Sequence, residues 1–318
     1  MFRLALLDDY QGIATKLADW SRLPAESEVR AFQDHLADED ALVARLQDFD
    51  AVLAMRERTP LPRGVLSRLP NLKLIVSTGM RNASIDVAYA QERGIVVCGT
   101  GGQRTSTAEL TWGLILSVMR NISTEDRSVR GGGWQTTIGP ALEGKTLGLL
   151  GLGNLGSQVA VVGRAFGMNL IAWSQNLTEQ RAGEFGARLV TRDELMSQSD
   201  VLSVHLVLSD RTRGLVGARE LALMKPTAYL VNTSRGPIVD EAALIDALRN
   251  RRIAGAGLDV FDVEPLPAGH PFRSLPNTVI TPHIGYVSNE SYARYYGDAL
   301  EDVLSFLDGK PVRVITAS

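Results

Sequence analysis

The chain has 318 residues, of which 45% are hydrophobic and 22% charged, and its formal net charge is −3 at pH 7. These values are typical of a globular protein long enough for two domains, and the lack of a Lys/Arg cluster argues against a nucleic-acid partner. A single cysteine, Cys98, excludes an intrachain disulfide framework, and no apolar run approaches the ~20 residues that span a bilayer. We therefore expect a cytoplasmic protein without a membrane partner.

In the first part of the chain, short apolar and β-branched runs alternate with helical patterns. Strands are predicted at residues 3–7, 29–32, 51–55, 73–77 and 95–98, and helices near residues 37–46, 65–69 and 85–92. This alternation is typical of a parallel sheet flanked by helices. Because the series contains no glycine-rich phosphate loop, we interpret it as a separate, flavodoxin-like sheet.

A long helix, predicted at residues 107–119, precedes a second α/β series. Its six predicted strands are residues 146–150, 169–173, 201–205, 228–232, 256–260 and 279–281, and a final helix is predicted at residues 289–307. Six strands with intervening helices match a complete Rossmann dinucleotide-binding sheet. The predicted fold is therefore α/β, with two doubly wound parallel-sheet domains.

The first strand of the second series runs into a G-x-G-x-x-G motif at residues 151–156. In this motif Gly151 permits a tight turn, Gly153 allows close approach of a pyrophosphate, and Gly156 allows the following helix to pack against the sheet. The helix N-terminus then offers N–H groups to the phosphates. The motif therefore predicts a dinucleotide cofactor.

The ribose position of this predicted site is unusual. An acidic residue normally ends the second strand and binds the ribose 2′-OH, but Ser174, Gln175 and Asn176 stand there, and the nearest downstream arginine is Arg181. Without an acid, the repulsion that excludes a 2′-phosphate is missing. The choice between NAD and NADP is open.

One cation, two acids and one histidine follow the ends of successive predicted strands in the second series. They are Arg235, Asp259, Glu264 and His283. Ligands bind at the carboxyl edge of such sheets. Arginine suits a substrate carboxylate because its planar fork binds both oxygens, histidine suits proton transfer near neutral pH, and a neighbouring glutamate stabilises the imidazolium. No metal site is predicted.

Each of these residues also has an ordinary structural interpretation. Arg235 could be a loop arginine that binds carbonyls, Glu264 a turn acid and His283 a buried histidine. Their joint placement on consecutive strand ends favours the functional interpretation. Among the other histidines, His35 is expected on the surface, and His205 is expected near the cofactor without an acid partner. His270 lies in a Pro-rich loop, and no second histidine–carboxylate pair is expected.

At these motifs the chain resembles the D-isomer-specific 2-hydroxyacid dehydrogenase family, over essentially its whole length. The resemblance implies transfer of a hydride between NAD or NADP and C2 of a small D-2-hydroxy acid or 2-oxo acid. It implies a substrate domain of residues 1–99 completed by residues 286–318, and a dinucleotide-binding domain of residues 100–285. It also implies a homodimer formed through the cofactor domain and the long helix.

The resemblance further implies the roles of individual residues. Arg235 would bind the substrate carboxylate, Glu264 would orient His283, and His283 would be the acid/base. The cofactor would be bound by Gly151, Gly153, Asn154, Leu155, Gly156, Ser174, Thr233, Asp259 and Thr107. The substrate would be approached by Arg56, Thr78, Gly79, Met80 and Arg81.

Three positions depart from the family pattern. Ser174 replaces the usual acid, Arg81 stands where glycine is common, and Val207 stands where proline is common. The first affects the choice of cofactor and the second the choice of substrate. From its C-terminus we also expect no regulatory extension of the kind found in long phosphoglycerate dehydrogenases.

Two other functions are open. Some relatives of this fold are transcriptional corepressors that sense the cofactor and bind peptides, and they can keep the same catalytic residues. Turnover of 2-oxo acids would separate that function from a dehydrogenase. A hydrolase that uses bound NAD would need an enlarged substrate domain, whereas the first part of this chain is compact.

Overall fold

The computed structural model describes residues 1–103 and 105–317. The chain forms two compact units, one of Met1–Gln103 with Val287–Ser318 and one of Arg104–Tyr286. The sequence placed these boundaries at residues 99 and 286. No helix in the described part of the chain has the length and apolar character needed to cross a membrane.

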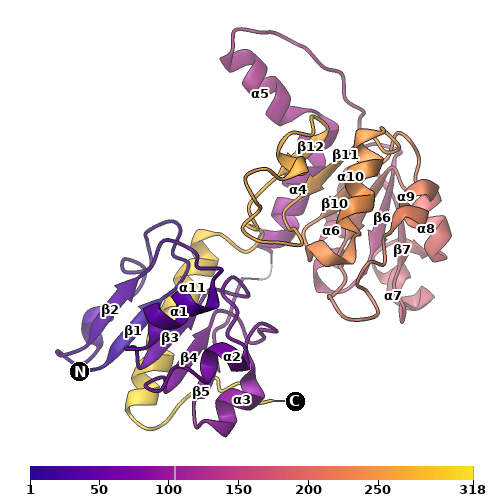
Figure 1. Cartoon of the computed structure of the whole chain (residues 1–318). Helices are drawn as coiled ribbons and strands as arrows, with labels where there is room; N and C mark the ends of the chain where they lie inside the picture. Colours follow the sequence, from indigo (N-terminus) through magenta and orange to yellow (C-terminus); the bar gives the residue numbers. More distant parts are fainter. Residues whose placement is uncertain (104, 318) are drawn as a thin grey trace. The chain divides into compact units, whose positions relative to one another are not determined.

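The first unit is built on a parallel sheet of five strands among its described residues, in the order β2-β1-β3-β4-β5 (Figure 1). The strands are β1 (Arg3–Leu6), β2 (Glu28–Ala31), β3 (Ala51–Ala54), β4 (Leu74–Ser77) and β5 (Val96–Gly99). This is the flavodoxin-like strand order, as predicted. Its topological switch point lies between β1 and β3, and every residue of β3 and β4 is buried.

Short helices and one long helix cover this sheet. They are η1 (Trp20–Arg22), α1 (Glu39–Leu46), α2 (Arg63–Leu66), α3 (Val87–Glu92) and α11 (Asn289–Leu307). The last helix begins and ends at the residues predicted from its apolar stripe, and it packs against β4 and β5. It returns the end of the chain to the first unit, where Val314 forms an antiparallel bridge with Cys98.

The second unit contains a parallel sheet of seven strands among its described residues, in the order β12-β11-β10-β9-β6-β7-β8. The strands are β6 (Thr146–Leu150), β7 (Asn169–Trp173), β8 (Ala187–Leu189), β9 (Val201–Val204), β10 (Tyr229–Asn232), β11 (Gly255–Leu258) and β12 (Thr278–Ile280). The order is that of a Rossmann sheet with one additional strand. The sequence predicted six strands and missed β8. This strand has only three residues at the sheet edge, too few to show an apolar pattern.

Helices lie on both faces of this sheet (Figure 1). They are α4 (Ser106–Met119), α5 (Ile122–Arg130), α6 (Asn154–Ala165), α7 (Glu179–Glu184), α8 (Arg192–Gln198), α9 (Ala218–Leu223), α10 (Glu241–Arg249), η2 (Gly236–Ile238) and η3 (Pro271–Arg273). The long helix α4 packs on β10 and β11, close to its predicted bounds. In contrast, α5 and the loop after it project away from the sheet.

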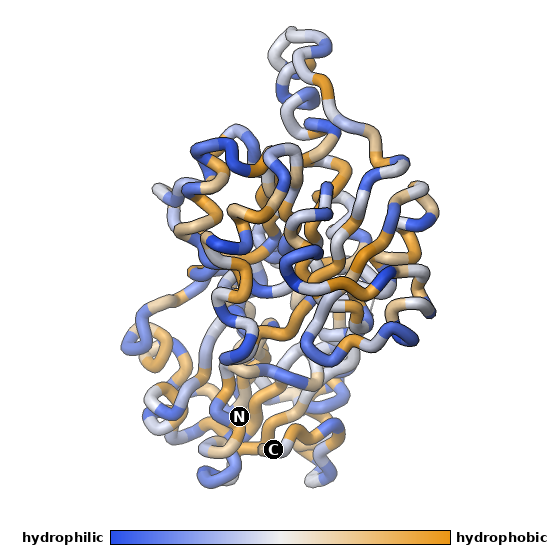
Figure 2. Tube along the Cα trace, turned by 90° about the vertical axis from the view of Figure 1, so that its right-hand side faces the viewer, coloured by the Kyte–Doolittle hydropathy of each residue, from blue (hydrophilic) through white to orange (hydrophobic). Residues whose placement is uncertain are grey.

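The strands of both sheets carry the hydrophobic residues, which form the orange interior segments of Figure 2. In the second unit the apolar core is split by the sheet into two clusters, one around Leu150, Leu202 and Leu230 and one around Leu147, Leu149 and Val231. Alternate residues of one strand therefore face opposite helix layers, as expected of a parallel sheet covered on both sides.

Candidate active site

The glycine-rich motif forms the turn between β6 and α6. Gly151 has a φ of +105°, and a Cβ there would lie 2.8 Å from the carbonyl oxygen of His205. A Cβ on Gly156 would lie 2.1 Å from the carbonyl oxygen of Gly151, so α6 can begin this close to the turn only with glycine. Gly153 is exposed, and a Cβ there would meet nothing within 4 Å.

The N-terminus of α6 has the properties of an anion site. Its N-cap is Gly153, which has no side chain to occupy the first N–H groups of the helix. The exposed Asn154 and the half-buried Leu155 follow it. Open backbone at Gly153, close packing at Gly156 and an uncapped helix end together fit a pyrophosphate, so the residues present fit a dinucleotide cofactor.

The predicted ribose position lies directly after β7. Ser174 is half-buried and begins a turn in which the Leu177 N–H donates to the Ser174 carbonyl (3.1 Å), and Gln175 and Asn176 are exposed. No carboxylate follows the strand. Arg181 lies on α7, where it forms an ion pair with Glu184 (2.5 Å) and stacks on Phe185.

His205 follows β9 and lies beneath the glycine-rich turn. Its Nε2 is 2.8 Å from Ser203 Oγ, and its buried Nδ1 has no hydrogen-bond partner among the described residues. Burial lowers the pKa of His205 to about 4, so its imidazole is neutral at physiological pH. His205 is therefore a poor proton donor. The exposed Val207 is two residues further along.

Arg235 lies in the turn after β10. Asn232 braces this turn, because its Nδ2 donates to the Arg235 carbonyl (2.9 Å) and its Oδ1 accepts from the Ser234 N–H (3.0 Å). The Arg235 guanidinium is half-buried and donates to the Ser234 carbonyl (2.8 Å). Thr233, in the same turn, is buried and hydrogen-bonded to Thr111 on α4 (2.7 Å).

Asp259 follows β11 and is fully buried. Its two oxygens accept from the Ile284 N–H (2.8 Å), the Gly285 N–H (2.8 Å) and the Thr281 hydroxyl (2.6 Å). Burial raises the pKa of this carboxyl despite these bonds. Asp259 therefore fixes the backbone of the loop after β12. The Thr107 hydroxyl on α4 also donates to the Gly285 carbonyl in this loop (3.0 Å).

His283 lies in that braced loop, with a φ of +53°. Its Nδ1 is 2.5 Å from Oε2 of Glu264, while Oε1 of Glu264 accepts from the Phe261 N–H (2.9 Å). The His283 ring meets Tyr286 edge to face at 5.6 Å. The His283 side chain is 20% exposed and that of Glu264 31%, so a small molecule can reach the pair.

The sheet brings the predicted residues of the second unit to one edge. β10, β11 and β12 are neighbours, and Arg235, Asp259, Glu264 and His283 follow their carboxyl ends. The glycine-rich turn follows β6, on the same edge. One edge therefore holds a dinucleotide-binding turn, a cation and a histidine–carboxylate pair, an arrangement suited to hydride and proton transfer at a carbonyl carbon.

The predicted substrate residues of the first unit lie at the carboxyl edge of its own sheet. Arg56 has a φ of +52°, and its guanidinium donates to the Thr78 carbonyl (3.0 Å). It lies directly over Gly79, where a Cβ would be 1.9 Å from the Arg56 Nη1. Asn82, missed by sequence reasoning, donates to the Arg56 carbonyl (2.6 Å).

Met80 and Arg81 complete this loop and are exposed. Gly79 has a φ of +95°, and its N–H donates to the Thr100 hydroxyl (2.9 Å). The loop is thus fixed at Thr78 and Gly79 and presents the longer side chains of Met80 and Arg81 to solvent.

Two expectations about the remaining histidines were wrong. The His35 side chain is 11% exposed and pairs with the buried Asp8 (3.1 Å), because the chain after β2 folds back onto the switch point of the first sheet. His270 pairs with Glu241 (2.9 Å). The described residues therefore contain histidine–carboxylate pairs besides His283–Glu264, and only the fold brings these partners together across 27 and 29 positions of sequence.

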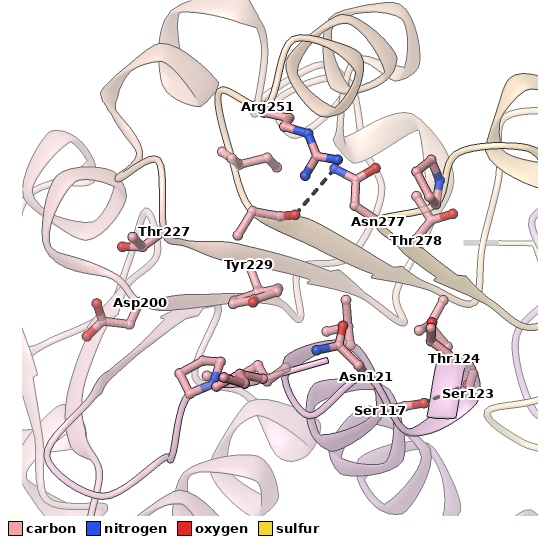
Figure 3. Close-up of a pocket in the computed structure, with 18 of the residues that line it drawn as sticks. Ser117, Asn121, Ser123, Thr124, Asp200, Thr227, Tyr229, Arg251, Asn277 and Thr278 are labelled. Carbon is pink, nitrogen blue, oxygen red and sulfur yellow. Dashed lines mark hydrogen bonds between the residues drawn. The ribbon is translucent and has the colours of Figure 1, made fainter. Parts of the chain in front are cut away.

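A cavity of about 610 Å³ lies elsewhere in the second unit (Figure 3). It is lined by Tyr229 and Thr278, at the amino ends of β10 and β12, and by Ser117, Asn121 and Thr124 from the α4–α5 region. Because it lies at the amino edge of the sheet, opposite the glycine-rich turn, it is not the dinucleotide site.

Known proteins similar to this chain include dehydrogenases and reductases. The NAD binding domain of the D-isomer specific 2-hydroxyacid dehydrogenases matches residues 112–285. A glyoxylate reductase from Aeropyrum pernix is 40% identical over 281 residues, which cover 85% of this chain and 84% of that protein. A D-3-phosphoglycerate dehydrogenase from Bacillus subtilis is 37% identical over 287 residues, 89% of this chain and 54% of that protein. The chain therefore spans about half the length of the latter relative.

A solved structure agrees over nearly the whole chain. An oxidoreductase from Ralstonia solanacearum has a TM-score of 0.93 and 40% sequence identity, covering 99% of this chain and 96% of that one.

Proposed function

The chain belongs to the D-isomer specific 2-hydroxyacid dehydrogenase family, and we propose that it interconverts a small 2-oxo acid and the corresponding D-2-hydroxy acid through Arg235, Glu264 and His283. The cofactor is NAD or NADP, which supplies or accepts the hydride at C2. The observation that carries the proposal is the 2.5 Å contact between His283 and Glu264 on the sheet edge that also holds Arg235 and the glycine-rich turn.

His283 is the proton donor in reduction. Its Nδ1 is engaged by Glu264, so Nε2 is the ring nitrogen that can give a proton to the substrate oxygen as the C2 carbonyl becomes an alcohol. Glu264 stabilises the imidazolium and fixes the ring orientation, and it is itself oriented by the Phe261 N–H. In the reverse direction His283 accepts the proton from the alcohol.

Arg235 binds the substrate carboxylate. Its backbone is fixed by Asn232, so the guanidinium extends from a rigid turn beside the histidine–carboxylate pair. A planar guanidinium binds both carboxylate oxygens and so sets the position of the adjacent C2 carbonyl. Arg56, Thr78, Gly79, Met80 and Arg81 add substrate contacts in this proposal, because they form the carboxyl edge of the first unit's sheet.

The enzyme uses NADPH at least comparably to NADH. Ser174, at the ribose position, is neutral and small, and it can donate a hydrogen bond to a phosphate oxygen. Arg181, the nearest downstream arginine, lies on α7 and is paired with Glu184, so a strong preference for NADP is not expected. Asp259 and Thr233 are both buried, and in this proposal they contact the cofactor at its nicotinamide end.

The substrate is a small 2-oxo acid such as glyoxylate or a phosphorylated 2-oxo acid, following the names of the relatives. Initial rates with NADH and NADPH against glyoxylate, hydroxypyruvate, pyruvate and 3-phosphohydroxypyruvate test this. Turnover of at least one acid supports a dehydrogenase. Cofactor binding without turnover of any would instead support the cofactor-sensing, corepressor-like function, which the relatives' names do not favour.

A homodimer forms through the second unit. On α5 and the loop after it, Ile122, Val129, Trp134 and Ile138 are between 51% and 99% exposed. Such a concentration of exposed apolar side chains on one projecting segment marks an interface. We propose a second copy as the occupant, because residues of this segment also border the cavity of about 610 Å³ and a twofold dimer uses the same surface on both copies.

A further inference from the structure

The loop that carries Glu264 is closed by a second carboxylate, that of Glu241. This residue begins α10, after the N-cap Asp240. Its Oε2 accepts from the Asp262 N–H (3.2 Å), and its Oε1 is 2.9 Å from Nε2 of His270. One carboxylate therefore binds both ends of the loop that has Glu264 near its start.

The hydrogen bonds of His270 define its tautomer. Its Nδ1 accepts from the Phe272 N–H (3.3 Å), so the ring proton lies on Nε2 and is donated to Glu241. The His270 ring also packs on Phe272 at 5.0 Å, and Phe272 is buried against Phe261. The far end of the loop is thus anchored to the apolar core through an imidazole that donates to Glu241.

The start of the loop, at Phe261 and Asp262, contacts both Glu264 and the turn that carries Arg235. The Phe261 N–H donates to Glu264, and the next N–H, that of Asp262, donates to Glu241. A Cβ on Gly236 would lie 2.2 Å from the Phe261 carbonyl carbon and 2.7 Å from the Asp262 nitrogen. The peptide between Phe261 and Asp262 therefore packs against Gly236, the neighbour of Arg235, on one side. On the other side its two N–H groups are bound by Glu264 and Glu241.

We propose that Glu241, held by His270, is a positioning residue for the reaction: by fixing the Phe261–Asp262 peptide it sets the distance between the Glu264–His283 pair and Arg235. This inference rests on the proposed roles of those three residues. The role of Glu241 is indirect, because Glu241 binds the Asp262 N–H and His270. Displacement of catalytic groups by about 1 Å can cost about 10²-fold in rate, so loss of the contact affects catalysis more than binding of the cofactor.

The first experiment replaces Glu241 in the full-length enzyme. Glu241→Ala removes both acceptor oxygens, and we expect kcat with the best 2-oxo acid to fall by roughly tenfold or more, while the Kd for the reduced cofactor changes less than about twofold. Glu241→Gln keeps one acceptor oxygen for the Asp262 N–H but loses the acceptor for the His270 Nε2–H, so we expect a kcat between those of Glu241→Ala and the wild type. It also serves as the test variant if Glu241→Ala does not fold. The matched control is Glu39→Ala, which removes the carboxylate at the first residue of α1 and leaves both constants unchanged.

A double-mutant cycle with Glu264→Gln separates positioning from a merely structural effect. If Glu241 acts through Glu264, its replacement costs much less in the Glu264→Gln background than in the wild type, because coupled residues are not additive. The same cost in both backgrounds overturns the positioning role and leaves the proposed function intact. A Glu264→Gln enzyme with wild-type rates overturns the proposed function, and the positioning role with it.

Discussion

Arg235 shows how one turn fixes both the place and the direction of a cation. The Asn232 side chain hydrogen-bonds to the Arg235 carbonyl and the Ser234 N–H. These two bonds fix the backbone from which the Arg235 side chain extends after β10. Arg235→Lys keeps the positive charge but loses the planar fork. Hydrogen bonds to charged groups contribute about 1.5–3 kcal/mol, so we expect kcat/KM for the 2-oxo acid to fall roughly 10- to 100-fold, mostly through KM.

The matched control for this prediction is Arg219→Lys. Arg219 binds both oxygens of Asp193 (3.0 and 2.5 Å) on the surface of the same unit, away from the strand ends. Its replacement should leave kcat/KM unchanged. Near-normal kinetics for Arg235→Lys would remove Arg235 from the site.

The proposed cofactor preference also depends on a single residue, Ser174. A carboxylate at the end of β7 accepts bonds from both ribose hydroxyls and repels a 2′-phosphate, whereas the neutral Ser174 does not repel a phosphate. Ser174→Asp should therefore shift the ratio of kcat/KM for NADH over NADPH towards NADH by tenfold or more, about 1.4 kcal/mol. A wild type that already prefers NADH by several hundred-fold would contradict the proposal, because the preference would then come from other contacts.

At the scale of elements, the turn between β6 and α6 depends on close approach of two backbone segments. Gly156→Ala places a Cβ 2.1 Å from the Gly151 carbonyl oxygen, so α6 must move away from the phosphate loop. We expect a loss of cofactor affinity of at least tenfold and a destabilisation of about 1–3 kcal/mol, measured by cofactor titration and urea unfolding. Gly297→Ala, in the middle of α11 with nothing within 4 Å of the new Cβ, should instead keep or raise stability.

The elements themselves could mostly be predicted from the sequence, because apolar periodicity and the glycine motif are local signals. The strands β6 and β7 and the helix α11 have the bounds that the pattern predicts. The edge strand β8 has only three residues, and α5 has no buried residues and only two apolar ones, Ile122 and Val129. Both elements exist through tertiary pairing or local hydrogen bonds that the hydrophobic pattern does not record.

The partners of individual side chains could be predicted only where strand ends place them. Arg235, Glu264 and His283 follow neighbouring strands of a parallel sheet, so the topology predicts that they converge. The pairs His35–Asp8 and His270–Glu241 join a loop to another strand end and a loop to a helix start. No spacing rule in the sequence connects such segments.

At the scale of the whole molecule, the projecting segment after α4 predicts self-association. Trp134 is 75% exposed and Ile138 is 99% exposed, which is costly in water unless a second copy covers them. The double variant Trp134→Glu, Ile138→Glu should sediment as a monomer at concentrations where the wild type is a dimer. Leu223→Glu, at an exposed apolar position on α9, is the control and should remain dimeric. A monomeric wild type would contradict the interface.

The histidine–carboxylate pair after β11 and β12 is the centre of the proposed reaction. General acid–base catalysis typically contributes about 10²–10⁴-fold, so His283→Ala should lose a factor of that order in kcat while it still binds the cofactor. In Glu264→Gln the imidazolium loses its charged partner, so we expect reduction to decline at lower pH than in the wild type.

The most direct measurement is therefore the pH profile of kcat/KM for 2-oxo acid reduction by the wild type and Glu264→Gln. We predict that the alkaline limb of the profile moves to lower pH in the variant. An unchanged profile, with His283→Ala retaining most of its activity, would contradict the assignment of His283 and Glu264 as the acid/base pair.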